Sequence, residues 1–182
     1  AAMRAADRLP HKGAIMESSA KFLGHPIHQM LVVLPAGLLI TAAVFEVVHI
    51  ANGNALMAMV SFHLIASGIV GGLLAAPFGF IDWIKVPVGT RARRIGALHG
   101  LGNVAVLVLA AVGLLLRWDA PGDPGGVSHG LIFAAVALLL VTAWLGGELV
   151  DRLGVGICDE VGLDAPSSLR GRRERSGARQ AH

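Results

Sequence analysis

The residues of this sequence that could do chemistry are histidines and carboxylates that stand inside or beside long apolar segments. Ionisable groups inside a membrane-spanning segment are costly and usually face other helices, so each is a candidate functional residue. They form two layers. The inner layer comprises His25, His28, Asp82, His99 and Glu148. The outer layer, toward the other end of the segments, comprises Glu46, His49, His63 and His129.

In the inner layer, Gly96, His99, Gly100 and Asn103 follow the i, i+3, i+4, i+7 spacing of one helix face. His28 enters the first apolar segment from the same side of the membrane as His99 enters the third. In an up-down-up-down bundle these two helices are diagonal neighbours, so both imidazoles can approach a common centre. Neutral imidazole is a good ligand for iron, copper and zinc.

A b-type haem with His28 and His99 as axial ligands fits this pattern. His25 is then a substitute ligand or hydrogen-bond partner, and Asn103 and Glu148 fix the orientation of the imidazoles. The alternative is that His28 and His99 only form hydrogen bonds, with Asn103, Glu148 or a lipid headgroup.

In the outer layer, Glu46 and His49 have the i, i+3 spacing of carboxylate-bridged metal sites, but the sequence lacks the second such pair that a di-iron site needs. His63 lies about 13 Å into its segment, at 1.5 Å per residue, whereas His129 stands at the membrane edge. We therefore expect Glu46 to bond a histidine and to influence packing or relay protons. A metal ion or second haem is the less favoured alternative.

Asp82 ends the second segment and is followed by Trp83, Lys85 and a basic cluster of Arg91, Arg93 and Arg94. An interfacial tryptophan among charged groups is typical of an anchored helix end. The alternative is that these arginines bind a quinone headgroup, a phosphate or a partner subunit.

Four long apolar runs must position these residues, at about 27–50, 55–80, 95–116 and 129–150. Each is long enough to cross a bilayer, which takes about 20 helical residues. The second and third contain no Asp, Glu, Lys or Arg, whereas helices of a soluble bundle keep a polar face. With 54% hydrophobic residues, 15% charged residues and a mean hydropathy of +0.68, the chain is predicted to be an all-α, up-down-up-down four-helix transmembrane bundle.

Lysine and arginine gather before the first run, between the second and third, and after the fourth; the other two links carry none, and Arg117 stands alone where the third run ends. This bias predicts that both termini face the cytoplasm. We divide the chain into an N-terminal segment (1–24), a membrane domain (25–152) and a basic, disordered tail (153–182). Because Met16 can serve as a start, whether residues 1–15 are native is open. A weak internal similarity suggests two hairpins related by an axis along the membrane normal.

The motifs exclude several classes of function. A single cysteine, Cys158, excludes an intrachain disulfide and cysteine-based zinc or iron–sulfur sites. No phosphate loop, hydrolase elbow or metalloprotease motif occurs, so we expect no independent enzymatic activity. The basic tail suits an anionic membrane surface rather than nucleic acid.

Several motifs resemble the bacterial membrane-protein family called domain of unknown function 2231 (DUF2231). They occur in residues 24–28, 31–35, 78–83, 99–103 and 144–150. The resemblance implies a small four-helix protein of the bacterial inner membrane, sometimes fused to or encoded near Rieske-type or cytochrome modules, with no settled activity. Gln29 stands where the family usually has proline, Glu46 where aspartate is common, and His63 is not a family residue.

These features favour a redox-linked subunit that binds haem b and works with a redox protein or other membrane subunits. A non-catalytic scaffold whose polar interior specifies helix pairing is the first alternative. The second is a proton or small-solute pathway through Glu46, His63 and Glu148.

Overall fold

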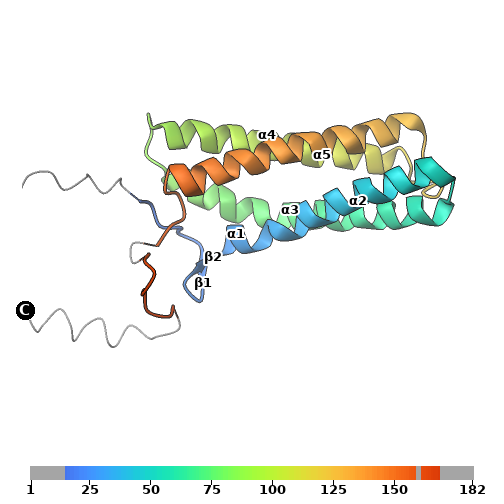
Figure 1. Cartoon of the computed structure of the whole chain (residues 1–182). Coiled ribbons are helices and arrows are strands. Elements are labelled where there is room, and N and C mark those ends of the chain that lie inside the picture. Colours follow the sequence, from blue (N-terminus) through green and yellow to red (C-terminus); the bar gives the residue numbers. More distant parts are fainter. Residues whose placement is uncertain (1–14, 159–160, 169–182) are drawn as a thin grey trace, which may run out of the picture.

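The computed structural model describes residues 15–158 and 161–168, and its main feature is a bundle of long antiparallel helices (Figure 1). The helices are α1 (Ile27–Leu31), α2 (Val33–Asn52), α3 (Ala55–Lys85), α4 (Arg91–Leu115), α5 (Gly126–Gly147) and the π-helical turn η1 (Glu148–Arg152). The first membrane crossing combines α1 with α2, and the last combines α5 with η1. Two short strands, β1 (Lys21–Phe22) and β2 (His25–Pro26), precede them.

Four crossings are long and apolar enough to span a membrane: Ile27–Asn52, Ala55–Lys85, Arg91–Leu115 and Gly126–Arg152. Their outward surface is rich in large apolar side chains, and Leu101 and Val70 are exposed over 69% and 57% of their surface. A soluble protein rarely presents so continuous an apolar face. The predicted all-α transmembrane bundle is therefore confirmed in class and in number of spans.

Local signals set the helix ends. Gly53 adopts a left-handed conformation (φ 68°) that ends α2, and the Asn54 side chain accepts a hydrogen bond from the Leu56 amide at 2.9 Å, which caps α3. Thr90 caps α4 by accepting from the Arg93 amide at 3.1 Å. For this reason α4 begins at Arg91, one turn before the apolar run from which we predicted it.

Small residues let the helices pack closely. A Cβ added to Gly68 would lie 2.9 Å from Leu39 Cγ, and one added to Gly113 would lie 2.9 Å from Ile132 Cδ1. A Cβ on Gly96 would meet Trp83 Cδ1 at 2.6 Å. Close approach through small residues is how helices associate in lipid. These glycines thus serve helix packing, whereas Gly100 is exposed and a Cβ added there would meet no other part of the protein within 4 Å.

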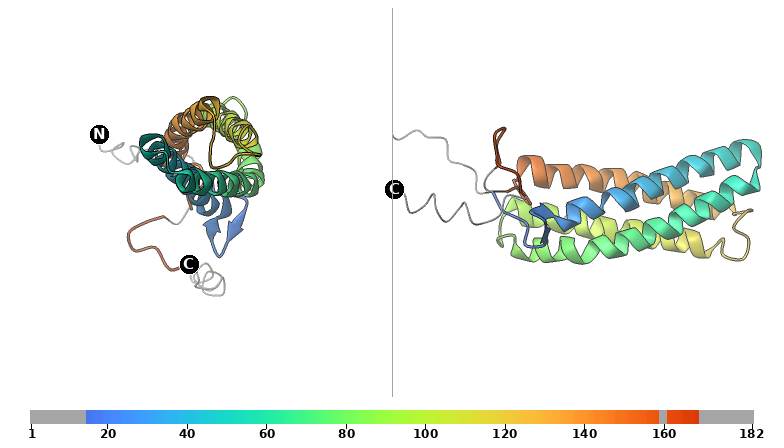
Figure 2. Two further views of the ribbon diagram at one scale, coloured as in Figure 1. Left: turned by 90° about the vertical axis from the view of Figure 1, so that its right-hand side faces the viewer. Right: turned by 90° about the horizontal axis from the view of Figure 1, so that it is seen from below.

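The two helical hairpins repeat one another in their buried positions. Ser61, Ile65, Gly68 and Ala75 on α3 correspond at one constant separation in sequence to Ser128, Ile132, Ala135 and Thr142 on α5. A second constant separation relates His28 to His99 and Leu39 to Ala110 on the first and third spans, and Glu46 to Arg117 in the turn after α4. Seen end-on, the four helices surround one central axis (Figure 2).

The segment before the bundle is fastened to the segment after it. The Met16 amide donates to the Gly154 carbonyl at 2.9 Å, and the Gly156 amide donates to the Met16 carbonyl at 2.6 Å. β1 and β2 pair through a turn at Leu23 and Gly24, both with positive φ. Residues 15–24 and 153–156 therefore share one end of the bundle, which we call the terminal end. Most of the expected tail, residues 159–160 and 169–182, lies outside the described residues.

Candidate functional site

The structure brings His28 of α1 and His99 of α4 together across the core of the bundle. Their ring centres are 6.3 Å apart and their ring planes are perpendicular, at 88°. The helices that carry them are diagonal partners, as expected from the up-down-up-down order. We call these two residues the histidine pair.

Each histidine of the pair is anchored in the same way by a neighbouring membrane crossing, the second or the fourth. His28 Nδ1 lies 3.0 Å from the Ala75 carbonyl oxygen of α3, and His99 Nδ1 lies 2.9 Å from the Thr142 carbonyl oxygen of α5. Because a carbonyl oxygen only accepts, Nδ1 must carry a hydrogen in both rings. In the neutral imidazole Nε2 then keeps its lone pair, which is the form that binds a metal.

Glycines make room for both rings. A Cβ at Gly79 would lie 2.7 Å from His28 Cε1, and one at Gly146 would lie 3.1 Å from His99 Cε1. Gly79 and Gly146 each stand one helical turn after the residue whose carbonyl anchors the ring. Any larger residue at Gly79 would displace the imidazole, so the backbone contact and the ring position depend on the same glycine.

Asn103 joins the pair, but the other inner-layer residues do not. The Asn103 amide nitrogen lies 3.2 Å from His99 Nε2. Glu148 instead forms an ion pair with Arg91 at 2.6 Å, because η1 carries it beyond the bundle core toward the start of α4. His25 lies in β2, is exposed, and has its Nε2 3.3 Å from the Ser168 hydroxyl.

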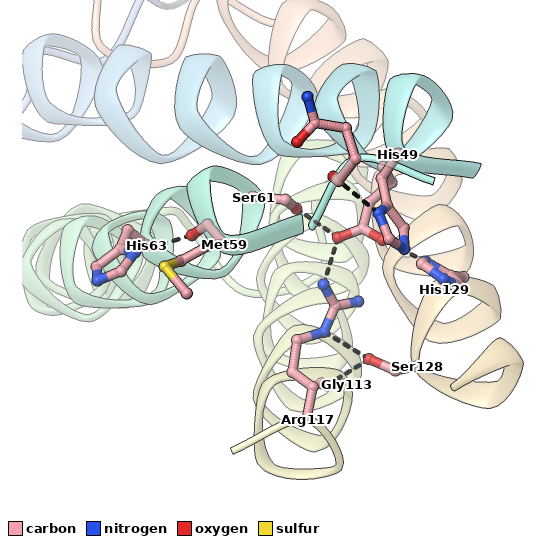
Figure 3. A network of polar contacts seen from close by, with 10 residues as sticks. His49, Met59, Ser61, His63, Gly113, Arg117, Ser128 and His129 are labelled. Carbon is pink, nitrogen blue, oxygen red and sulfur yellow. Dashed lines mark hydrogen bonds and ion pairs between the residues drawn. The ribbon is translucent and has the colours of Figure 1, made fainter. Parts of the chain in front are cut away.

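At the other end of the bundle Glu46 is completely buried, and three donors surround its carboxylate (Figure 3). The Ser61 hydroxyl donates to Oε1 at 2.5 Å, Arg117 Nη1 also donates to Oε1, and His129 Nδ1 donates to Oε2. Arg117 Nε in turn donates to the Ser128 hydroxyl at 2.7 Å. We call these five residues the Glu46 cluster.

The Glu46 cluster joins all four membrane crossings, because α2, α3, α5 and the turn after α4 each contribute a residue. Glu46 and Arg117 have fully buried side chains, so each neutralises a charge that would be strongly disfavoured alone. Sequence reasoning placed Glu46 and His129 in the outer layer but missed Arg117 as the partner. The available signal was that Glu46 and Arg117 have the same sequence separation as His28 and His99.

Of the remaining outer-layer histidines, neither bonds Glu46. His49 Nδ1 lies 3.0 Å from the Asn54 carbonyl oxygen, and its ring lies 5.6 Å from that of His129. His63 is exposed and bonds the Met59 carbonyl of its own helix at 2.8 Å. Within residues 15–158 and 161–168, no three His, Cys, Asp or Glu side chains are grouped to hold a metal ion.

Where the second span ends and the third begins, Asp82, Trp83 and Arg93 form structural contacts. Asp82 accepts hydrogen bonds from the Ser18 hydroxyl at 2.7 Å and from the Ser19 amide at 2.8 Å. The Arg93 guanidinium lies 3.8 Å from the centre of the Trp83 ring and donates to the Trp83 carbonyl at 2.5 Å. Arg94 is exposed. Asp82 and Arg93 therefore hold the helix ends and the N-terminal segment in place.

Residues 24–159 match the family described as predicted membrane protein (DUF2231). The chain belongs to the DUF2231 family. No curated protein and no solved structure is significantly similar to it. The part that matches the DUF2231 family contains the histidine pair, Asn103, the whole Glu46 cluster and Asp82, while Ser18, which bonds Asp82, precedes it.

Proposed function

We propose that this membrane protein binds one haem b through His28 and His99 and transfers electrons as a subunit of a redox system. The histidine pair carries the proposal. Two imidazoles bonded to one metal at about 2 Å have ring centres roughly 6 Å apart, and the observed separation is 6.3 Å. The two rings thus already have the spacing that a shared metal requires.

The hydrogen bonds of the pair support the same role. Metal-binding histidines almost always donate their second ring N–H to a carbonyl or carboxylate, which fixes the ring and leaves the other nitrogen for the metal. His28 and His99 both do so through Nδ1. A porphyrin supplies four further nitrogen ligands, so two protein donors suffice for haem but are few for a bare ion.

Bound haem would supply one-electron chemistry, with a potential tuned by its axial ligands and by burial. The chain's own contribution is to hold two neutral imidazoles by backbone carbonyls and to surround them with apolar helices. Asn103 must release His99 Nε2 before that nitrogen can bind iron. We place the protein in the bacterial inner membrane, with a redox protein or further membrane subunits as electron donor and acceptor.

The test is the absorption spectrum of the detergent-solubilised protein, oxidised and dithionite-reduced, after expression with ample haem supply. We expect a Soret band that sharpens and shifts on reduction, and that is lost or altered in both His28→Ala and His99→Ala. His63→Ala is the matched control, because that ring is exposed and bonds only its own helix. A colourless protein, or one whose spectrum neither substitution changes, refutes the proposal in favour of a scaffold.

A further inference from the structure

The surroundings of His28 and His99 differ at two positions. Four residues after His99 comes Asn103, whereas four residues after His28 comes Val32. The residues that anchor the rings differ as well, since Thr142 on α5 corresponds to Ala75 on α3. In an otherwise repeated arrangement, only the second half thus places polar side chains beside the imidazole.

The orientation of the Asn103 amide follows from its contacts. Its terminal nitrogen lies 2.9 Å from the His99 carbonyl oxygen, which only accepts, so this atom must be the NH₂ group. Its second hydrogen is directed to His99 Nε2 at 3.2 Å. The Asn103 carbonyl oxygen lies 3.0 Å from the Thr142 hydroxyl. Asn103 therefore occupies the lone pair of His99 that a metal would use.

His28 has no such competitor. Its Nδ1 is held by the Ala75 carbonyl, and its Nε2 has no hydrogen-bond partner among the residues that the structure describes. Val32 has no donor with which to reach it. The Nε2 atoms of the two histidines are thus unequal in availability, although their rings are anchored alike.

We propose that His28 is the permanent ligand of the haem, and that Asn103 makes His99 an exchangeable ligand, so that this face of the site admits a small neutral molecule of the carbon monoxide, nitric oxide or dioxygen class. The inference rests on the proposed function. A haem face from which the protein ligand withdraws is open to such molecules, and neighbouring hydrogen-bond donors influence what binds. The Asn103 amide would hold His99 Nε2 whenever that nitrogen is not bound to the metal.

Carbon monoxide added to the dithionite-reduced protein tests the proposal. We expect the wild type to bind carbon monoxide with a shift of the Soret band. Asn103→Val, which gives the second half the residue of the first, should lower the affinity at least tenfold because His99 then stays bound. His99→Ala should keep haem and bind carbon monoxide at least as well as the wild type, while His28→Ala should lose haem.

Val32→Asn is the matched control, since it offers His28 the same amide without removing the one beside His99, and it should retain carbon monoxide binding. Size-exclusion profiles establish that each variant is folded. If the wild type binds haem but does not bind carbon monoxide, this inference is wrong while the proposed function stands. Equal haem loss in His28→Ala and His99→Ala also overturns it, whereas absence of haem from the wild type refutes the proposed function and this inference together.

Discussion

Glu46 and Arg117 show what a membrane interior demands of charged residues. Both side chains are fully buried, and the carboxylate receives hydrogen bonds from Ser61 and His129 in addition to the guanidinium. Removing one charge of such a pair leaves the other without compensation, which is far worse than removing both. The pair therefore fixes the relative positions of the spans more than it adds net stability.

Arg117→Met should lower the free energy of unfolding by about 3–5 kcal/mol, because it leaves the Glu46 carboxylate buried without its cation. Glu46→Met should cost a similar amount, while the double substitution should recover most of the loss. Reversible unfolding in mixed detergent micelles measures all three. Arg94→Met is the control, since that side chain is exposed. Additive losses in the double variant would contradict this account.

The link between α3 and α4 shows how an element boundary is fixed. Arg93 lies over the Trp83 ring and donates to the carbonyls of Trp83 and Val86, at 2.5 and 3.2 Å. The Trp83 indole nitrogen donates in return to the Arg93 carbonyl at 3.0 Å. One arginine thus adds hydrogen bonds to two carbonyls at the end of α3 and sets the direction in which α4 begins.

Arg93→Lys should destabilise this link although it keeps the charge, because lysine lacks the planar fork that stacks on Trp83 while bonding two carbonyls. We expect a loss of about 1–3 kcal/mol, on the order of one hydrogen bond from a charged donor and one cation–π contact. Hydrogen exchange at the amides of residues 84–90 should accelerate. Arg94→Lys is the matched control, and equal exchange in both variants would show that the stacked geometry contributes nothing.

The sequence predicted correctly those features of the elements that depend on helix length and on the order of the helices along the chain. Apolar length predicted the four spans, and up-down order predicted that His28 and His99 meet. The partner of Glu46 was not predictable from helical periodicity, because Arg117 lies just beyond an apolar run; only the sequence separation shared with His28 and His99 indicated it. The outward orientation of His63 was also hidden, since a helix that is apolar all round does not reveal which face meets lipid. The π-helical turn η1 directs Glu148 away from the bundle core, and no sequence pattern predicts this turn.

The whole molecule is two hairpins that repeat one pattern around the bundle axis. Equivalent positions hold the histidine pair near the terminal end and Glu46 opposite Arg117 at the far end. Both hairpins begin from the same side, so the repeat relates them by an axis along the membrane normal. The ligand proposed above would therefore meet equivalent residues on both sides, except where Asn103 and Thr142 break the repeat.

The whole molecule also has an orientation in the membrane, and labelling of its single cysteine, Cys158, can test which end faces the cytoplasm. Lysine and arginine gather at the terminal end, which predicts that this end faces the cytoplasm. Cys158 is exposed there. A membrane-impermeant maleimide should therefore label it only after the cells are permeabilised.

In a Cys158→Ser background, Asp123→Cys places the thiol in the link between α4 and α5, on an exposed residue at the opposite end. This variant should react in intact cells, and Cys158→Ser alone should not react at all. The reverse pattern would place the histidine pair near the outer face, so that the electron transfer proposed above would involve partners on that side of the membrane.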